Sequence, residues 1–201
     1  QAIFNLKTKK VLGFEALMRW NHPERGLLMP MDFSDIAKET GLIEQIDWQI
    51  YEQVCRDLPI LLGIADYISI NVSPRHLGHE NFANRLLSLM AEYGVAPSNL
   101  HMEVTEDALI EHPELGLKLL TQLKLAGVKI SLDDFGTGYS SFSYLHKYPL
   151  DCLKIDHSFI KTLTNNPDDK TIHLVSAIHA LGMSLGLEMI VEGIETDDQC
   201  E

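Results

Sequence analysis

Residues 67–73 read Tyr-Ile-Ser-Ile-Asn-Val-Ser, a run in which apolar and polar side chains alternate. The same alternation returns at residues 102–105, 130–133 and 153–156. Because side chains along a strand point to opposite faces in turn, each run predicts a strand with one apolar face and one polar, ionisable face. A strand buried on both faces of an open parallel sheet is usually apolar throughout. The pattern therefore favours a closed barrel over an open doubly wound sheet, although the order of elements permits both.

Amphipathic stretches separate these runs and predict helices between the strands. We expect helices over residues 32–39, 45–57, 82–93, 114–126 and 171–185, and strands over residues 67–72, 100–105, 128–133, 152–155 and 189–192. Near the N-terminus, residues 2–6 and 11–18 flank Lys7-Thr8-Lys9-Lys10, which indicates a hairpin. Alternating strands and helices predict a mainly parallel α/β sheet with crossover helices. Polar groups near the carboxyl ends of several strands are typical of the mouth of a (β/α)8 barrel.

The composition is that of a globular protein large enough for a sizeable core. Of the 201 residues, 45% are hydrophobic and 22% are charged, and 16 basic against 29 acidic residues give a net charge of −13. This charge argues against a DNA or RNA polymer as a partner, since such polymers are bound through basic surfaces. A small anionic substrate is compatible with it, because a bound metal reverses the local sign of the charge.

The cysteines Cys55, Cys152 and Cys200 are far apart and form no C-x-x-C motif. We therefore expect no disulfide framework and no zinc ribbon, and we place the domain in the reducing cytoplasm. No stretch approaches the ~20 apolar residues that a membrane-spanning helix needs. Since Gln1 is not an initiator methionine, we interpret the chain as a fragment, and a membrane anchor of the full-length protein would lie outside it.

Ionisable and amide side chains gather at the ends of the predicted strands. Five carboxylates and one amide share this placement, and they belong to Glu15, Asn71, Glu103, Asp133, Asp134 and Glu192. Crowded carboxylates repel one another, which raises their pKa values unless a cation holds them. Oxygen ligands without Cys or His select Mg²⁺ or Mn²⁺ rather than Zn²⁺. The adjacent pair Asp133 and Asp134 suggests a bridging ligand between two ions, and ions ~3.5–4 Å apart suit the hydrolysis of a phosphodiester.

Six segments stand out in order along the chain. They are Glu15-Ala16-Leu17-Met18-Arg19-Trp20, Asn71-Val72-Ser73-Pro74, Glu103-Val104-Thr105-Glu106, Asp133-Asp134-Phe135-Gly136-Thr137-Gly138-Tyr139-Ser140-Ser141, Leu153-Lys154-Ile155-Asp156 and Val191-Glu192-Gly193-Ile194-Glu195-Thr196. Together they resemble the EAL-domain phosphodiesterases of bacterial cyclic di-GMP signalling. Pro30 and Glu39-Thr40-Gly41-Leu42-Ile43 also follow the family's order. A lone Glu-Ala-Leu carries no weight, because these residues are common in helices, whereas six ordered segments do.

The resemblance implies a TIM-like (β/α)8 barrel whose first strand runs antiparallel to the others. It assigns residues 1–201 to a single EAL phosphodiesterase domain. That domain would lack the family's N-terminal helix and its last helix and strand, so the barrel is expected to be truncated at its C-terminal end.

The resemblance also implies a reaction, the metal-dependent hydrolysis of cyclic di-GMP to linear pGpG. Two ions, Mg²⁺ or Mn²⁺, would be bound in each site. One ion would be held by Glu15, Asn71, Glu103 and Asp133, and the second by Asp133 and Asp134. Glu15 is accordingly counted among the catalytic residues.

Further roles follow from the same resemblance. Lys154 would orient the nucleophile or stabilise charge on the phosphate, and Glu192 would act through metal-bound water as a proton acceptor. Glu106 would brace the loop from Asp134 to Ser141. The expected substrate-binding residues, with Arg19 on a phosphate oxygen and Trp20 against a guanine, are Leu17, Arg19, Trp20 and Pro30.

Two other functions remain open at this point. A catalytically inactive EAL domain would bind cyclic di-GMP as a sensor or regulatory module, but such domains typically lose metal ligands or the loop motif, which this sequence retains. A truncated barrel could also serve dimerisation alone within a sensor protein. The resemblance further implies a homodimer fused to sensory or other signalling domains.

His76 and His79 form an H-x-x-H without further ligands at zinc-site spacing, so we interpret them as packed or solvent-facing.

Overall fold

The computed structural model describes residues 1–136, 142–165, 169–196 and 199. Part of the loop assigned to Glu106, residues 137–141, lies outside the described residues, as does Cys200. Within the described part, the main sheet consists of β1 Ala2–Phe4, β2 Val11–Ala16, β5 Tyr67–Asn71, β6 Leu100–Thr105, β7 Lys129–Phe135, β8 Cys152–Ile155 and β9 Glu188–Val191. Their spatial order is β1-β2-β5-β6-β7-β8-β9.

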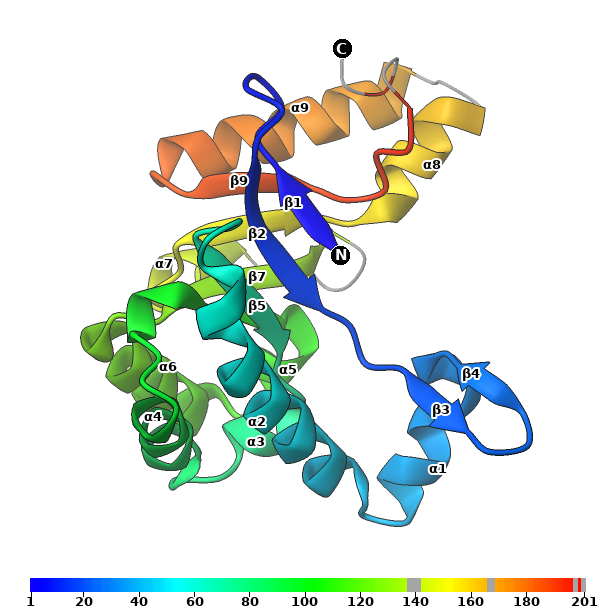
Figure 1. The fold of residues 1–201 in the computed structure, drawn as a ribbon. Helices are drawn as coiled ribbons and strands as arrows, with labels where there is room; N and C mark the ends of the chain where they lie inside the picture. The colour runs from blue at the N-terminus through cyan, green and yellow to red at the C-terminus, as the bar shows by residue number, and fades with distance from the viewer. Residues whose placement is uncertain (137–141, 166–168, 197–198, 200–201) are drawn as a thin grey trace.

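The sheet has the barrel-type topology that the sequence predicts. Strand β1 pairs antiparallel with β2, and each later neighbour pairs in parallel. The strands curl into part of a barrel with helices packed around the outside (Figure 1). The N-terminal hairpin and the antiparallel first strand are therefore confirmed.

The helices alternate with the strands of the sheet. They are α1 Ser34–Glu39, α2 Ile43–Leu61, α3 Pro74–Leu77, α4 Phe82–Glu92, α5 Glu106–Glu111, α6 Pro113–Ala126, α7 Phe142–Lys147, α8 His157–Asn165 and α9 Asp169–Ser184, with short 3-10 helices η1 Pro30–Asp32 and η2 Pro97–Asn99. The five amphipathic predictions correspond to α1, α2, α4, α6 and α9. The helices α3, α5, α7 and α8 were not predicted, because helices of four to nine residues carry too little periodicity to be detected.

The two faces of the sheet differ as the alternation predicts. On β6, Met102 and Val104 are fully buried and belong to the hydrophobic core together with apolar residues of α2, α4 and α6. The alternate positions carry polar groups that are also buried, among them Ser69, Glu103, Ser131, Asp133 and Lys154. Burial of so many polar groups is unfavourable unless they are paired with one another or with ions. The partners of these groups in the interior of the partial barrel therefore need to be identified.

A small lobe extends from the sheet between β2 and α2. It consists of the hairpin β3 Trp20–His22 and β4 Gly26–Leu28, followed by η1 and α1, and it projects away from the barrel (Figure 1). The Trp20 ring packs edge-on against His22 and Phe33, with centroids 4.7 and 5.6 Å away. Among the helices that the structure describes, none is both long and apolar enough to cross a membrane.

A stability prediction follows from the close packing of Gly13 at the base of the sheet. A Cβ atom on Gly13 would lie 2.4 Å from the Tyr67 ring, which itself stacks on His101 with centroids 3.6 Å apart. Because the stacked ring has little room to move, we expect Gly13→Ala to lower the free energy of unfolding by about 1–3 kcal/mol. Urea denaturation measures this change, with Gly63→Ala as the control, since nothing lies within 4 Å of a Cβ there. Equal midpoints for the two variants would contradict the prediction.

Candidate active site

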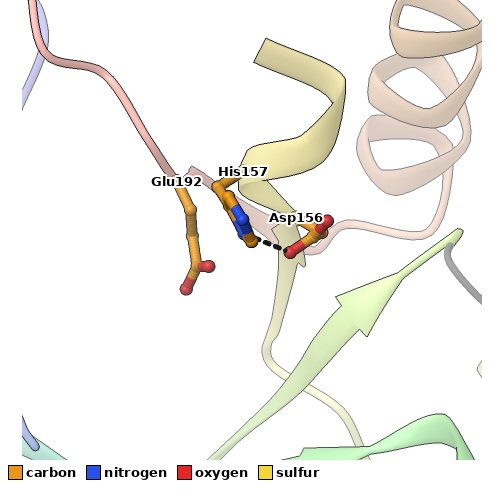
Figure 2. Close-up of side chains that lie close together, drawn as sticks. All are labelled: Asp156, His157 and Glu192. Atoms are coloured by element: carbon orange, nitrogen blue, oxygen red, sulfur yellow. Dashed lines mark hydrogen bonds and ion pairs between the residues drawn. The ribbon is translucent and has the colours of Figure 1, made fainter. Parts of the chain in front are cut away.

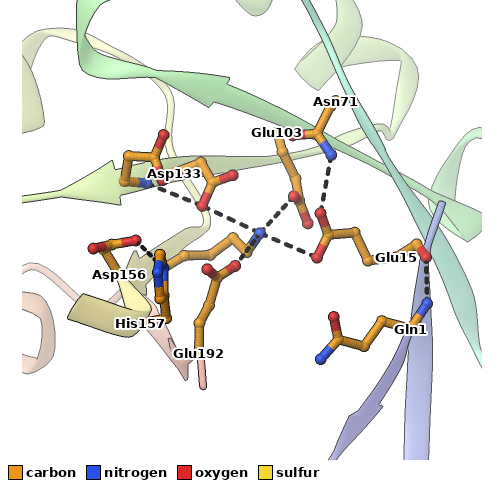
Figure 3. Close-up of polar contacts among 10 residues, drawn as sticks. Gln1, Glu15, Asn71, Glu103, Asp133, Asp156, His157 and Glu192 are labelled. Carbon is orange, nitrogen blue, oxygen red and sulfur yellow. Dashed lines mark hydrogen bonds and ion pairs between the residues drawn. The ribbon is translucent and has the colours of Figure 1, made fainter. Parts of the chain in front are cut away.

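The carboxyl ends of neighbouring strands bring most of the predicted site together. Figure 3 shows Glu15 on β2, Asn71 at the end of β5, Glu103 on β6 and Asp133 on β7 turned toward one centre. Glu192, the residue directly after β9, completes the group. Parallel strands end at the same edge of the sheet, so residues up to 177 positions apart in sequence become neighbours.

Lys154 on β8 occupies the middle of this cluster. The side chain is 1% exposed, and its Nζ lies 2.5 Å from Glu103 Oε2, 2.7 Å from Glu192 Oε1, 3.1 Å from Asp133 Oδ1 and 3.6 Å from Glu15 Oε2 (Figure 3). A lysine has three N–H donors and no acceptor, so four carboxylates compete for it. The sequence placed Lys154 at a strand end, and the structure shows that its ammonium group pairs with Glu103, Asp133, Glu192 and Glu15.

The electrostatics of the cluster are dominated by burial and by the repulsion among its acids. Burial raises the pKa of Glu103 to about 7, against the opposing effect of Lys154 and with a further rise from Glu15. Burial also raises the pKa of Glu192. For Lys154, burial would lower the pKa, but Glu103, Asp133 and Glu15 outweigh it and hold the pKa above its usual value. The ammonium group therefore stays charged at neutral pH.

Asn71, the last residue of β5, connects the cluster to that strand. Its amide Nδ2 donates a hydrogen bond to Glu15 Oε1 at 2.9 Å (Figure 3). The amide oxygen is then the atom of Asn71 that can serve as a ligand, since an amide nitrogen has no free lone pair for a metal. The contact joins two of the predicted metal ligands directly.

The donor set fits a hard divalent cation. Four carboxylates share one ammonium group, which leaves an excess of negative charge in a largely buried place. The ligand atoms available are carboxylate and amide oxygens, the type that Mg²⁺ and Mn²⁺ prefer. The excess of acids over bases is the physical reason to expect a cation here.

Known proteins are similar to this chain in sequence and in fold. A family model described as "EAL domain" matches residues 1–201. This chain belongs to the EAL domain family. The bifunctional diguanylate cyclase/cyclic di-GMP phosphodiesterase MucR of Pseudomonas aeruginosa is 42% identical over 194 residues, which cover 95% of this chain and 28% of MucR. The cyclic di-GMP phosphodiesterase RocR of the same organism is 34% identical over 191 residues, covering 94% of this chain and 48% of RocR.

A solved structure described as the PaMucR phosphodiesterase in complex with c-di-GMP has the same fold. Its TM-score is 0.92 at 37% identity, and the match covers 100% of this chain and 81% of that one. This EAL domain thus spans less than half the length of the two curated relatives above.

Asp134, which is predicted to hold the second ion together with Asp133, directly follows Asp133 on β7. Its backbone has a positive φ of 54°, and its N–H donates to Asp133 Oδ1 at 3.0 Å. Burial, followed by the charges of Asp133 and Asp156, raises the pKa of Asp134. A non-glycine residue in this strained conformation is a feature that functional sites often contain.

Sequence reasoning missed His157, which lies next to the EAL cluster. One ligand atom each from Asp156, His157 and Glu192 lie within 4.8 Å of one another, and His157 Nδ1 is 2.8 Å from Asp156 Oδ2 (Figure 2). Asp156 Oδ1 also accepts a hydrogen bond from the Ser158 N–H at 3.0 Å, which orders the first turn of α8. The signal was available in the sequence, since His157 directly follows the Lys154-Ile155-Asp156 segment.

The brace assigned to Glu106 has a counterpart in the structure. Glu106 begins α5, is 8% exposed, and its Oε1 accepts a hydrogen bond from the Gly136 N–H at 3.3 Å. Gly136 has a φ of 93°, a conformation that glycine adopts without strain. Glu106 therefore holds the beginning of the loop that follows β7.

The predicted substrate-binding residues lie on the segment that leaves β2 and on the lobe. Leu17 and Trp20 are 38% and 44% exposed, and Arg19 Nη1 donates to the Met18 carbonyl at 2.6 Å. Pro30 begins η1. Within the described part of the chain, none of these four side chains joins the ion pairs around Lys154. They lie outside the cluster, and we refer to Leu17, Arg19, Trp20 and Pro30 below as the rim residues.

Proposed function

We propose that this EAL domain is a metal-dependent phosphodiesterase that hydrolyses cyclic di-GMP to linear pGpG. The observation that carries the proposal is the convergence of Glu15, Glu103, Asp133 and Glu192 on the buried Lys154, with Asn71 bonded to Glu15. A sheet that needed only stability would not gather four carboxylates around one buried lysine, two of them (Glu103 and Asp133) buried as well, because each buried charge costs free energy unless it is paired. The names of MucR and RocR, and the c-di-GMP complex of the PaMucR phosphodiesterase, support the choice of substrate.

The residues suited to hold the ions are those predicted from the resemblance. Glu15, Asn71, Glu103 and Asp133 would hold one Mg²⁺ or Mn²⁺, and Asp133 with Asp134 the second. When bound, such ions lower the pKa of water and neutralise charge on a phosphodiester.

The chain's own residues then supply positioning and proton transfer. In the reaction, water attacks one phosphorus, the bond to the ribose 3′ oxygen breaks, and that oxygen gains a proton, which gives a 5′-phosphate and a 3′-hydroxyl. The Lys154 ammonium stabilises the negative charge that develops on the phosphoryl oxygens. The raised pKa of Glu192 brings this carboxylate closer to the range in which it can accept the proton of the attacking water.

Outside the cluster, the rim residues hold the dinucleotide. Arg19 binds a phosphate oxygen and Trp20 offers its exposed ring to a guanine, with Leu17 and Pro30 as neighbouring wall. Glu106 orders the start of the loop after β7. We further propose that the domain acts in the cytoplasm and as a homodimer. It would be part of a longer signalling protein, as its relatives are.

A chromatographic assay of the purified chain with cyclic di-GMP tests the proposal. Formation of pGpG with Mg²⁺ or Mn²⁺, but not with a chelator, is the expected result. Bound but unconverted cyclic di-GMP under the same conditions would instead support the catalytically inactive sensor.

The raised pKa of Glu103 gives the metal affinity a predictable pH dependence. With a pKa of about 7, Glu103 in the metal-free site binds a proton more tightly than an ordinary glutamate does. That proton must leave before the oxygen can bind a cation, so we expect the apparent affinity for Mn²⁺ to rise from about pH 6 and to level off above about pH 8. Isothermal titration calorimetry across this range measures it. An affinity that is constant or falls with pH would contradict the prediction.

A further inference from the structure

Two residues of α2 contact the chain where β5 ends and α3 begins. Tyr51 and Asp47 are four positions apart, so they share one face of the helix. The Tyr51 hydroxyl donates to the backbone carbonyl of Asn71 at 3.2 Å. Asp47 Oδ2 lies 3.1 Å from Nε2 of His76, a residue of α3. One helix face thus contacts both Asn71 and the short helix α3 after it.

The Tyr51 ring has little freedom to move. It is 1% exposed and lies among Trp48, His76 and Phe82, with ring centroids 5.4, 5.6 and 6.0 Å away. His76 is also 1% exposed, so of the two alternatives left open by the sequence, packed or solvent-facing, it is packed. Burial, aided by the charge of Asp47, raises the pKa of Tyr51 well above its usual value, so the hydroxyl remains a donor.

The contact bears on the site because Asn71 is the last residue of β5. Its carbonyl is bonded to Tyr51 on one side, and its side-chain amide is bonded to Glu15 Oε1 at 2.9 Å on the other. Fixing the carbonyl limits rotation of the Asn71 backbone, and the direction of the side chain follows from the backbone conformation. A ligand held within a fraction of an ångström needs support of this kind from its neighbours.

We propose that Tyr51 is a positioning residue, whose hydroxyl orients Asn71 so that its amide oxygen can serve as a metal ligand. The inference rests on the proposed function, because it assumes that Asn71 binds an ion. Tyr51 touches neither substrate nor ion, and it acts only through the backbone of Asn71.

The test compares Tyr51→Phe with Tyr93→Phe in the full chain. Each variant loses one hydroxyl group at α2. Tyr51 belongs to this helix, whereas Tyr93 donates from outside it to Glu52 of α2 at 2.9 Å, away from the site. We expect Tyr51→Phe to weaken Mn²⁺ binding, measured by calorimetry, about fivefold. This factor corresponds to the net free energy of one ordinary hydrogen bond. At limiting Mn²⁺ its kcat should fall, excess Mn²⁺ should restore it, and KM for cyclic di-GMP should not change. Tyr93→Phe should match the wild type in all three.

The outcomes separate the inference from the function on which it rests. Wild-type Mn²⁺ affinity in Tyr51→Phe, whatever its melting temperature, would overturn the positioning role. A loss of kcat that excess Mn²⁺ fails to restore would do the same. If the wild type binds no Mn²⁺, the proposed function itself fails and the inference falls with it. Should Tyr51→Phe not fold, Tyr51→Met removes the same hydroxyl with an adaptable apolar chain and carries the same expectation.

Discussion

Replacing Lys154 by methionine is expected to lower kcat for cyclic di-GMP by about 10²–10³-fold, the range seen when a group that stabilises developing charge is removed. Methionine matches the length of the lysine stem, so the change removes the ammonium and little else. That ammonium contacts Glu103, Asp133 and Glu192 within 3.1 Å. Steady-state kinetics at saturating Mn²⁺ measure the effect on kcat and KM separately.

Binding of Mn²⁺ should behave differently in this variant. Lys154 competes with any cation for the same carboxylates, so its removal is expected to preserve or tighten Mn²⁺ binding while kcat falls. Lys129→Met is the matched control, because Lys129 also pairs with a glutamate, Glu188 at 3.1 Å, but is 41% exposed and begins β7, whereas Asp133 lies toward the other end of that strand. A change confined to KM would show that Lys154 serves ground-state binding and not the reaction.

Glu15→Gln is expected to reduce turnover by about 10–100-fold or more, because it replaces a charged metal ligand by a neutral one of the same shape. The amide can still meet Asn71, which now donates to Glu15 Oε1 at 2.9 Å. Cyclic di-GMP binding should persist, since the rim residues Arg19 and Trp20 are unaffected. Calorimetry with the nucleotide and with Mn²⁺ separates the two effects.

A control for this variant is Glu188→Gln, which changes an exposed glutamate at the start of β9. It should retain wild-type turnover. If Glu15→Gln turned over cyclic di-GMP at the wild-type rate with unchanged Mn²⁺ affinity, Glu15 would not be a ligand and the assignment of the cluster would be wrong.

The sequence predicted the strands and the polar interior because both depend on a local pattern. The alternation around Ser69 and Glu103 places every second side chain on one face, whatever the rest of the chain does. The same pattern, with the order of elements, was enough to predict parallel strands whose acids meet at one end. The antiparallel first strand came from the resemblance and from the hairpin around Lys7.

Contacts through space were less accessible to sequence reasoning. That Lys154 lies within 3.6 Å of Glu15 depends on the curvature and register of strands far apart in the chain. Tyr51 looks like an ordinary apolar position of α2, since only the crossing of that helix behind β5 brings its hydroxyl to Asn71. His157 was overlooked because a single histidine forms no motif of its own, although it directly follows the Lys154-Ile155-Asp156 segment. Its 2.8 Å contact with Asp156 appears only in the fold.

The most direct test of the account is a titration of the metal-free chain with Mn²⁺, in which ion occupancy and conversion of cyclic di-GMP to pGpG are followed in the same samples. The account predicts no product before Mn²⁺ is added and a rate that rises with occupancy of the cluster formed by Glu15, Asn71, Glu103 and Asp133. Product formed at an equal rate in the presence of a chelator, or no product at full occupancy with cyclic di-GMP bound, would contradict it.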